Sequence, residues 1–479
     1  MKINHRVPQQ RHEDKDENKV LIATNIFRAY DIRGVVNKDL NPEIAELIGK
    51  AFGTYLLERG TRDVLVGRDT RSTSEEYQNT LSRGLLSTGC NVIDIGLTLS
   101  SILYFARQYY KIDGGVMVTA SHNPPDWNGF KLCHGLNAIV EEEIRKVGDI
   151  LFSGKFRSGR GRTKNLEVFP TYLNEIKKRI KLKKSLNVVV DGGNATPSIF
   201  VPDFLKSLGC KVIPLHCEID PSFPHGFLDP VKLDYYQNLI KKVKAEQADL
   251  GILLDGDGDR VGFVDEKGSI WLGDTILTLL IREIIPKNPD RKVIVEVKDS
   301  EVVVEETKRL GGIPIFWKTG HALLDHKVFE EKAILCGEMS CHYWITDNWY
   351  YFDDAIFALA RVLKIISDSG RGLSQLVAEL PEYKATPEYR LDCPEDKKFK
   401  LVEELVKYFR DKCNKVVDID GIRGYTEDGW FLIRASNTQP LIVVRCEAKT
   451  KEGLEKIKKL VKDKLNEYPY ISLDWQKQP

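Results

Sequence analysis

The sequence repeats one pattern three times, and this repeat limits the chain to a small set of architectures. A β-branched run followed by polar loop residues begins at Val64, Val188 and Val293, in the segments VLVGRDTRSTS, VVVDGGNATPS and VIVEVKDSEVV. Such a run is typical of a buried strand that leads into a helix. Self-similarity on this scale indicates repeated structural units. We therefore expect three related units in one chain.

Each unit continues with two more apolar runs. The second runs are TGCNVIDIG, LGCKVIPLH and LGGIPIFWK, and the third runs begin GGVMVTASHN, LGILLDGDGD and AILCGEMSCH. The order strand, helix, strand and then strand again is typical of α/β proteins with a largely parallel sheet. The predicted fold class is therefore α/β, with three similar mixed or parallel-sheet domains.

The most unusual loops of the chain occupy the same place in each unit. TASHN, DGDGD and GEMSCH all follow the third strand pattern. Ligands of open α/β sheets bind outside the carboxyl ends of the strands. Three equivalent loops on three related domains are therefore expected to converge on one central cleft.

The remainder of the chain has a different pattern. After PEYKATPEYR comes a charged, helix-like stretch, then WFLIRASNTQPLIVVRCEA and a Lys-rich amphipathic stretch. This order predicts a smaller C-terminal α+β domain whose polar loop joins two apolar strands. The predicted domains are residues 21–167, 168–269, 270–381 and 382–479, preceded by a disordered lead over residues 1–20.

Composition is that of a globular protein and excludes some classes of function. A chain of 479 residues is too long for one ordinary hydrophobic core, so several domains are expected. The positive charges of 71 Lys plus Arg nearly balance the negative charges of 70 Asp plus Glu. Nucleic acid and a membrane surface are therefore not expected as partners. No apolar run approaches the about 20 residues of a membrane span, and the polar N-terminus does not read as a secretory signal. The nine cysteines include no C-x-x-C pair. We expect a cytoplasmic protein.

The segment DGDGDR predicts a site for a divalent cation. Asp255, Asp257 and Asp259 alternate with glycines directly after the apolar run LGILL. Three carboxylates so close to a buried strand need a cation to neutralise them, and glycine allows the backbone to turn their oxygens toward one centre. Hard oxygen ligands favour Mg²⁺ or Ca²⁺ over Zn²⁺.

Two other interpretations of this segment remain open. It resembles an EF-hand calcium loop, because Glu266 falls at the twelfth position, but Arg260 stands where the sharp turn needs glycine and the flanks look like strands. It is also compatible with a solvated acidic loop that binds no ion.

The loop TASHNPP contains a candidate nucleophile. Serines in such loops are usually turn or cap residues, and Ser121 lacks the G-x-S-x-G context of hydrolases. Its hydroxyl needs a base or nearby cations to react. Lys131, in NGFKL, is a candidate cation, and His122 has the simpler interpretation of supporting the loop.

Three further loops carry groups suited to a phosphorylated sugar. RASNTQP offers an arginine, hydroxyls and an amide that suit a phosphate oxyanion, although a polar hairpin turn explains it equally well. In GEMSCH, Glu338 and Ser340 lie two residues apart and can point the same way toward sugar hydroxyls. Lys318 and His321, in KTGH, form another cationic group.

Together these motifs resemble the alpha-D-phosphohexomutase superfamily, and within it the phosphomannomutase/phosphoglucomutase group. The resemblance extends from FRAYDIRG at Phe27 to RASNTQP ending at Pro440, with one motif per domain in the family order. It implies four domains around a central cleft, the first three sharing a fold and the fourth closing over the ligand.

The resemblance also implies roles for individual residues. Ser121 is the expected phosphoserine and a ligand of Mg²⁺, together with Asp255, Asp257 and Asp259, and Arg260 helps to hold it. The residues expected to bind the sugar hydroxyls are Glu338 and Ser340. Those expected to bind the phosphate that is not transferred are Arg434, Ser436, Asn437 and Thr438. Those expected to line the cleft are Tyr30, Arg33, Lys298, His321 and His342. The candidates for proton transfer are Lys131, Arg33 and His342.

The activity implied by the resemblance is interconversion of hexose 1-phosphate and hexose 6-phosphate, with mannose and/or glucose as the sugar. Mg²⁺ is the expected cofactor, and a hexose 1,6-bisphosphate is the expected intermediate and activator. Hexose phosphates are the expected partners, with no obligate protein partner evident. The alternatives are a phosphoglucosamine mutase and a non-catalytic phosphosugar-binding protein.

The chain departs from the family pattern in three places. Cys341 stands where the group usually has glycine, DGGNAT has alanine where glycine is common, and the HGFLDP stretch is irregular. The change at Cys341 bears on substrate preference more than on the chemistry.

Overall fold

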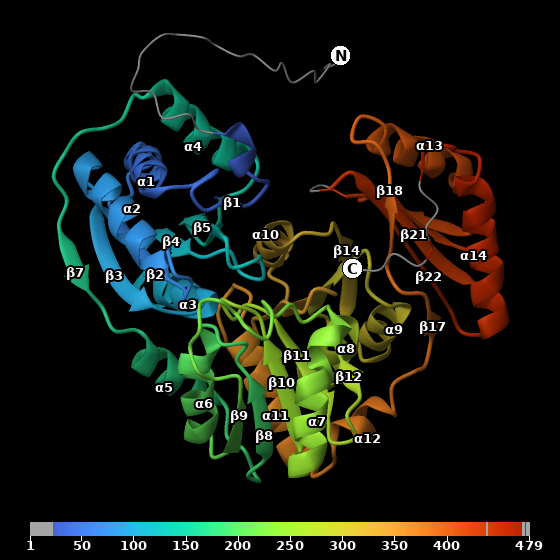
Figure 1. The fold of residues 1–479 in the computed structure, drawn as a ribbon. Coiled ribbons are helices and arrows are strands. Elements are labelled where there is room, and N and C mark those ends of the chain that lie inside the picture. Colours follow the sequence, from blue (N-terminus) through green and yellow to red (C-terminus); the bar gives the residue numbers. More distant parts are fainter. Residues whose placement is uncertain (1–22, 437–438, 472–474, 476–479) are drawn as a thin grey trace.

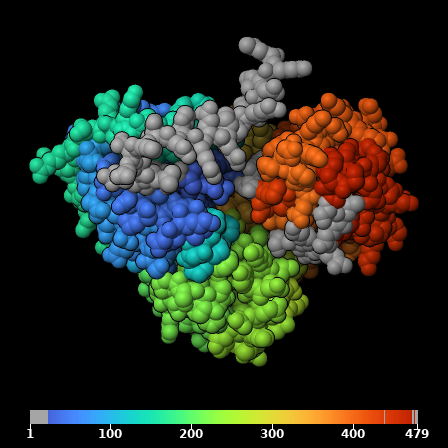
Figure 2. All heavy atoms as spheres, turned by 45° about the horizontal axis from the view of Figure 1, so that its top comes forward, coloured from blue at the N-terminus to red at the C-terminus, as the bar shows by residue number. Residues whose placement is uncertain are grey.

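The structure, a computed structural model, describes residues 23–436, 439–471 and 475. The expected lead over residues 1–20 lies outside the described residues. Four sheets follow one another along the chain, and Figure 1 shows them as consecutive lobes from blue to red. In the space-filling view of Figure 2 the first and fourth units form separate lobes on either side of the second.

The first unit is built on a seven-stranded sheet with the order β1-β5-β4-β2-β3-β7, to which β6 adds beside β5. Strands β2, β3, β4 and β7 run parallel, whereas β1 and β5 run antiparallel to their neighbours. Its elements are η1 (Thr24–Ile26), β1 (Ile32–Val35), α1 (Pro42–Leu57), β2 (Asp63–Arg68), α2 (Ser74–Thr88), β3 (Asn91–Leu97), α3 (Ser100–Tyr110), β4 (Gly114–Val118), β5 (Trp127–His134), β6 (Asn137–Ala138), α4 (Glu142–Ser153) and β7 (Thr163–Asn165).

The second unit has a five-stranded sheet with the order β12-β11-β10-β8-β9. The three strands β8, β9 and β10 are parallel and the other two are antiparallel. Its elements are α5 (Phe169–Arg179), β8 (Asn187–Asp191), α6 (Pro197–Ser207), β9 (Lys211–Leu215), η2 (Leu233–Tyr236), α7 (Gln237–Glu246), β10 (Leu250–Leu254), β11 (Val261–Asp265) and β12 (Ile270–Trp271).

The third unit has a four-stranded sheet with the order β14-β13-β15-β16, again with three parallel strands and one antiparallel strand. Its elements are α8 (Gly273–Ile284), η3 (Ile285–Lys287), β13 (Lys292–Glu296), α9 (Glu301–Arg309), β14 (Ile313–Trp317), α10 (His321–Glu331), β15 (Leu335–Gly337), β16 (Tyr343–Ile345), α11 (Ala355–Ser369) and α12 (Leu373–Val377).

The fourth unit is an antiparallel sheet with the order β17-β22-β21-β20-β19, in which β18 also pairs with β22. Two helices pack on it, as the red lobe of Figure 1 shows. Its elements are β17 (Lys384–Ala385), β18 (Tyr389–Asp392), α13 (Lys398–Arg410), β19 (Lys415–Val417), β20 (Ile422–Tyr425), β21 (Gly429–Ala435), β22 (Leu441–Ala448) and α14 (Lys451–Leu465).

The predicted repeat and fold class are confirmed. The strand orders β3-β2-β4-β5, β9-β8-β10-β11 and β14-β13-β15-β16 place the first, second and third strand of each unit in the same positions, followed by an antiparallel fourth strand. One element was missed in every unit. The helices α3, α7 and α10 precede the third strand, because a parallel strand can be reached only by a crossover connection, usually a helix.

The core explains how the units are held together. One apolar cluster runs through the first three units and includes Leu65, Val190 and Val293. The fourth unit has its own cluster, with Phe431 and Val444 among its members. The first three units therefore share a core, whereas the fourth is a separately packed body.

Polar contacts join the fourth unit to the third. Arg423 donates to the carbonyl oxygens of Val297 and Asp299, at 3.0 and 2.6 Å, and Arg445 pairs with Asp274 at 3.2 Å. Trp430 packs against Val297 in a small apolar cluster.

None of the helices in the described part of the chain has the length and apolar character of a membrane span. All nine cysteines lie in the described part of the chain and are unpaired.

Close packing of α1 against α2 predicts an effect on stability. A Cβ on Gly84 would lie 2.2 Å from the carbonyl oxygen of Glu46, and the helix backbone cannot move aside cheaply. We expect Gly84→Ala to destabilise the first unit by about 1–3 kcal/mol and to lower the midpoint of urea unfolding followed by circular dichroism.

Gly148→Ala is the matched control for this variant. Gly148 also lies inside a helix, but its nearest neighbour is an atom of Phe27 at 3.4 Å, an ordinary contact. Alanine there gains up to about 1 kcal/mol of helix propensity. Equal midpoints for the two variants would contradict the account of the α1–α2 contact.

Candidate active site

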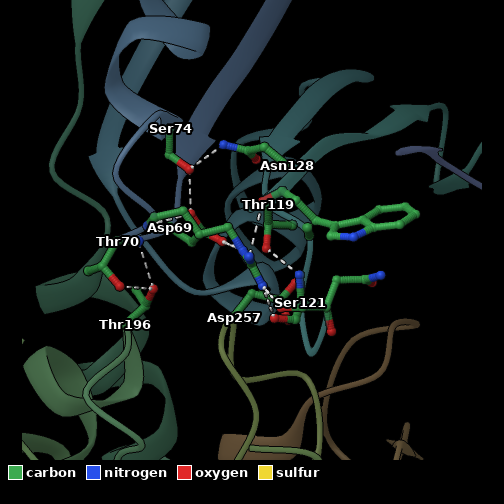
Figure 3. A network of polar contacts seen from close by, with 12 residues as sticks. Asp69, Thr70, Ser74, Thr119, Ser121, Asn128, Thr196 and Asp257 are labelled. Atoms are coloured by element: carbon green, nitrogen blue, oxygen red, sulfur yellow. Dashed lines mark hydrogen bonds and ion pairs between the residues drawn. The ribbon is translucent and has the colours of Figure 1, made fainter. Parts of the chain in front are cut away.

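The loop after β4 holds Ser121 in an unusual backbone conformation. Ser121 is 2% exposed and has a φ of 49°, in the left-handed region that costs a non-glycine residue about 1–2 kcal/mol. Its N–H donates to Thr119 Oγ1 over 2.8 Å, a contact that Figure 3 shows. The loop therefore fixes the direction in which the Ser121 side chain points.

Arg71, just beyond the end of β2, binds the backbone of the loop that holds Ser121. Its guanidinium donates to the carbonyl oxygens of Ser121 (2.7 Å), Asn123 (2.6 Å), Pro124 (2.6 Å) and Trp127 (3.0 Å). The side chain is 4% exposed. One buried cation thus satisfies four backbone acceptors, and the loop cannot shift without leaving some of them unpaired.

Asp69 extends this network within the first unit, and its neighbour Thr70 extends it to the second. It accepts from Ser74 Oγ at 2.5 Å and lies 3.3 Å from Arg71 Nε. Beside it, Thr70 N donates to Thr196 Oγ1 over 3.1 Å, so the loops after β2 and β8 meet (Figure 3). The equivalent loops of two repeated units are therefore joined by a direct hydrogen bond.

The three aspartates of DGDGDR lie directly opposite Ser121. Asp255, Asp257 and Asp259 are at most 2% exposed, and one oxygen of each lies within 4.8 Å of the others. Ser121 Oγ donates to Asp255 Oδ2 over 2.6 Å. The predicted nucleophile is therefore in contact with one of the predicted metal ligands, Asp255, which lies 134 positions further along the chain.

The charges of this triplet need compensation. Burial, with the charges of Asp259 and Asp257, raises the pKa of Asp255 well above its ordinary range. Asp257 Oδ1 and Asp259 Oδ1 are buried without a hydrogen-bond partner. Unpartnered carboxylate oxygens around one centre are the donor set that a hard dication requires. The residues present therefore fit Mg²⁺.

Within the chain, the Lys131 ammonium compensates part of the negative charge of the triplet. Its ammonium lies 2.6 Å from Asp257 Oδ2 and 2.5 Å from Asp259 Oδ2. Burial alone lowers the pKa of Lys131, but the two carboxylates raise it well above its ordinary value. Ser100, the first residue of α3, donates to Asp257 Oδ2 at 2.6 Å, so the helix N-terminus also stabilises this carboxylate.

The loop after β15 approaches the same triplet from the third unit. His342 Nε2 lies 3.3 Å from Asp259 Oδ1, and its Nδ1 lies 3.0 Å from Glu338 Oε2 and from Ser340 Oγ. Burial lowers the pKa of His342, but the Asp259 and Glu338 carboxylates raise it to about 10. Three predicted site residues thus form one hydrogen-bonded group.

His321 and Tyr30 lie beside this group. The His321 and His342 rings are 4.7 Å apart, and His321 Nε2 lies 2.9 Å from Asp353 Oδ1. Burial and the Glu338 carboxylate raise the pKa of Tyr30 to about 12. Tyr30 belongs to the first unit, so residues from three units meet here.

Arg33 and Arg260 flank the serine loop. Arg33 donates to Asn123 Oδ1 at 2.6 Å and to the Ala120 carbonyl oxygen at 3.3 Å. The Arg260 N–H donates to Asp255 Oδ1 over 3.1 Å, while its guanidinium lies 3.2 Å from Asp229. Both arginines therefore add positive charge close to Ser121.

The predicted phosphate-binding residues are described only in part. Arg434, at the end of β21, donates to Asp420 Oδ2 at 2.9 Å, and Asp420 also accepts from Thr319 N of the third unit at 3.1 Å. Lys298 lies 3.2 Å from Glu296 and 3.4 Å from Glu388. Ser436 is buried. Asn437 and Thr438 lie outside the described residues.

Cys341 occupies a position that favours glycine. Its φ is 73°, and its side chain is fully buried beside Glu338 and His342. Burial raises the pKa of its thiol to about 12, so the side chain is a neutral group. Its carbonyl oxygen accepts from Val261 N over 3.2 Å, which joins the loops of the second and third units.

Sequence reasoning missed Arg71, Ser100 and Asp353. The GRDTR segment was used only as evidence for a strand, and a charged residue directly after a buried strand was the available signal for Arg71. Ser100 and Asp353 carry no such signal, because their importance comes from side chains distant in the sequence.

Models of one protein family match four stretches of the chain. The phosphoglucomutase/phosphomannomutase alpha/beta/alpha domains I, II and III match residues 24–158, 170–268 and 272–383, and the C-terminal domain matches residues 388–464.

Individual proteins are similar over nearly the full length. A phosphomannomutase/phosphoglucomutase of Pseudomonas aeruginosa is 40% identical, covering 93% of this chain and 96% of its own. A probable phosphoglucosamine mutase of Pyrococcus abyssi is 37% identical, covering 91% and 98%. The crystal structure of a phosphoglucomutase/phosphomannomutase family protein from Burkholderia thailandensis has a TM-score of 0.88 at 36% identity, covering 93% and 98%.

The Arg71 contacts predict a loss of turnover without a loss of affinity. In Arg71→Lys the charge remains, but an ammonium has three donors and cannot reach four carbonyl oxygens in a plane. A displaced serine loop costs about 100-fold in rate. We expect kcat for hexose-phosphate isomerisation to fall by about that factor while KM changes little.

Arg68→Lys is the control, because Arg68 ends the same strand and pairs with the exposed Glu75 at 3.4 Å. It should keep normal kcat. A full kcat in Arg71→Lys together with a lowered melting temperature would assign Arg71 to stability alone.

Proposed function

Because this chain belongs to the phosphoglucomutase/phosphomannomutase family of hexose-phosphate mutases, we propose that it interconverts the 1- and 6-phosphates of mannose and/or glucose. The proposed route uses a phosphorylated Ser121 and a hexose 1,6-bisphosphate. The observation that carries the proposal is the 2.6 Å contact between Ser121 Oγ and Asp255, within a group of buried carboxylates and Lys131.

Ser121 is suited to carry a phosphoryl group because cationic side chains lie around its loop and around the facing aspartates. A phosphoserine has a charge of about −1.5 to −2 at neutral pH. Lys131, Arg33 and Arg260 all lie around the serine loop and the triplet. The fixed backbone of the loop holds Oγ in one place, and positioning accounts for much of the rate of such transfers.

Asp255, Asp257, Asp259 and Ser121 are the residues that would hold Mg²⁺. When bound, the ion neutralises charge on the transferring phosphoryl group. The unpartnered Oδ1 of Asp257 supports this assignment. Lys131, which pairs with Asp257 and Asp259, balances the remaining charge and keeps the carboxylates ionised.

The transfer step requires a proton acceptor and a proton donor. The bond between Ser121 Oγ and phosphorus breaks and Ser121 Oγ takes a proton, while a bond forms between phosphorus and the free sugar hydroxyl, whose proton passes to a base. When the other phosphate returns to Ser121, the serine hydroxyl loses its proton and the departing sugar oxygen takes one. Lys131, Arg33 and His342 are the candidates for this exchange.

Of these three, His342 is best placed to exchange a proton with the sugar. Its pKa of about 10 keeps it protonated at neutral pH, so it can donate to the departing sugar oxygen. It accepts the proton in the opposite direction of the same step. Lys131 is committed to two carboxylates that stabilise its charged form.

Residues of the third and fourth units would bind the remainder of the ligand. Glu338 and Ser340 carry oxygens suited to sugar hydroxyls, and their 2.7 Å hydrogen bond already orients them together. Arg434, Ser436 and Lys298 supply the groups for the phosphate that is not transferred, with Asn437 and Thr438 proposed beside them. Both orientations of the bisphosphate must be accepted, because each phosphate faces Ser121 in turn.

A phosphoglucosamine mutase is the second candidate. The chain is 37% identical to the probable phosphoglucosamine mutase of Pyrococcus abyssi. This is only slightly below its 40% identity to the phosphomannomutase/phosphoglucomutase of Pseudomonas aeruginosa, which supports the second candidate. Turnover compared on mannose, glucose and glucosamine 1-phosphates decides between the two. A preference of more than 10-fold for glucosamine 1-phosphate, about 1.4 kcal/mol, would replace the first proposal with the second.

Removal of the serine hydroxyl should stop the transfer. We expect Ser121→Ala to reduce mutase turnover to background and to abolish the phosphate detected on the protein by intact-mass spectrometry. Binding of glucose 1-phosphate should survive, since the other binding groups remain. The exposed Ser185→Ala serves as control and should be normal in all three measurements. Normal turnover in Ser121→Ala would rule out the phosphoserine route.

Removal of the Arg434 side chain should weaken binding of the ligand without touching the metal ligands. A charged hydrogen bond contributes about 1.5–3 kcal/mol, so we expect KM for hexose phosphate to rise by about 10- to 100-fold in Arg434→Ala. The Mg²⁺ concentration for half-maximal activity should not change. The exposed Arg410 provides the control Arg410→Ala, and an unchanged KM in Arg434→Ala would contradict the assignment.

A further inference from the structure

A second group of potential metal ligands lies beside the aspartate triplet. It consists of Asp259, His321, His342 and Asp353, each offering one ligand atom within 4.8 Å of the others. Asp259, His342 and Asp353 are at most 3% exposed. We call these four residues the histidine cluster. It differs from the triplet in containing two imidazoles, and neither Asp353 nor His321 has a role in the triplet.

Several ligand atoms of the histidine cluster lack hydrogen-bond partners. Asp259 Oδ1, His321 Nε2 and Asp353 Oδ2 are all buried and unpartnered. His321 Nε2 lies 2.9 Å from Asp353 Oδ1, but the two atoms are not aligned as a hydrogen bond. Buried polar atoms without partners are costly. One ligand atom of each of the four residues lies within 4.8 Å of the others, so a positive group bound among them would give such atoms a partner.

Two distances within the histidine cluster are close to the spacing of ligand atoms around a four-coordinate metal ion. Zinc–nitrogen and zinc–oxygen bonds of about 2.0–2.1 Å place tetrahedral ligand atoms about 3.3–3.4 Å apart. His342 Nε2 is 3.3 Å from Asp259 Oδ1, and His321 Nε2 is 2.9 Å from Asp353 Oδ1. Since all four ligand atoms lie within 4.8 Å of one another, side-chain adjustment would have to bring the remaining pairs to this spacing.

The outer contacts of His342 are those of a metal-binding histidine. Its Nδ1 lies 3.0 Å from Glu338 Oε2, which leaves Nε2 directed at Asp259. A carboxylate on the far nitrogen fixes the ring and increases the basicity of the ligating nitrogen. Glu338 itself is 4% exposed and accepts from Ser340 Oγ.

Asp259 is able to serve both sites because its two oxygens face different partners. Oδ2 is directed at Lys131 and the triplet, at 2.5 Å, whereas Oδ1 is directed at His342. The carboxylate can therefore contribute one oxygen to each centre.

Two imidazoles with two carboxylates favour a borderline ion such as Zn²⁺ or Co²⁺ over Mg²⁺, which prefers oxygen ligands.

We propose that Asp259, His321, His342 and Asp353 form a second metal site, for a transition-metal dication of the Zn²⁺ type, which shares only Asp259 with the proposed Mg²⁺ ligands. An ion bound there displaces the Nε2 proton of His342 into solvent and binds the freed lone pair together with one oxygen of Asp259. It therefore inhibits turnover by occupying the group that exchanges a proton with the sugar. The inhibition rests on the proposed function, whereas the binding does not.

Cobalt binding tests the site directly. Co²⁺ is titrated into the full chain in excess Mg²⁺, and visible absorption is followed, because four-coordinate Co²⁺ absorbs much more strongly than six-coordinate Co²⁺. We expect one equivalent of the strongly absorbing form. His321→Gln and Asp353→Asn should each weaken binding by about 10- to 100-fold or more, by analogy with loss of groups around known metal sites. Circular dichroism establishes that each variant is folded.

Two control variants separate this site from its neighbours. His326 lies on the same helix as His321 and contacts the Ala138 carbonyl oxygen instead, so His326→Gln should bind Co²⁺ normally. Asp255→Asn removes a ligand of the triplet alone and should keep the strong absorption. Loss of the signal in Asp255→Asn, with its retention in Asp353→Asn, would place Co²⁺ at the triplet and overturn the proposal. So would the absence of any strong absorption.

A turnover assay tests the inhibitory consequence. Zn²⁺ should inhibit the wild-type mutase at saturating Mg²⁺, and Asp353→Asn should require at least about 10-fold more Zn²⁺ for the same fractional inhibition. Binding without inhibition would overturn the regulatory part. If the wild-type chain has no mutase activity, the proposed function fails, and the cobalt titration still decides whether the metal site exists.

Discussion

The burial of three carboxylates in one place is the constraint on which the rest of the site depends. Asp255, Asp257 and Asp259 are removed from water, and the desolvation of such a group is prohibitive without compensating charge. Lys131 provides part of that charge from the neighbouring unit, and the unpartnered oxygens mark where a dication would provide the remainder. The first two units must therefore stay together, because separating them would remove Lys131 from Asp257 and Asp259 and leave these charges uncompensated.

The packing of the chain matches this requirement. The first three units share one apolar core, so the loops bearing Ser121, the aspartates and His342 are held by a continuous body. The fourth unit has its own core and meets the third mainly through Arg423, Arg445 and Trp430. An arrangement of this kind keeps the proposed reacting groups in one continuous body, while Arg434 and Ser436, proposed to bind the distant phosphate, belong to the separately packed fourth unit.

Backbone strain is concentrated where the site needs accurate placement. Ser121 and Cys341 both adopt positive φ without being glycine, and both lie in loops at the carboxyl ends of parallel strands. Such conformations persist only where the surroundings determine them fully. For Ser121 those surroundings are the Arg71 guanidinium and Thr119. For Cys341 they are the complete burial of the thiol and the hydrogen bond from Val261.

The sequence by itself determined the three repeated α/β units, the smaller C-terminal α+β unit and the identity of the charged loops. These are local properties, because β-branched runs, glycines and acidic triplets are visible within short windows such as LGILLDGDGDR. It did not give the helix before each third strand, whose amphipathic pattern competes with the stronger signal of the flanking strands. Only the tertiary structure decided that Arg71 supports the serine loop, that Ser100 faces Asp257, and that Asp353 joins His321 beside His342. Each of these contacts joins residues distant in the sequence or depends on the direction of a side chain, and the folded backbone fixes both.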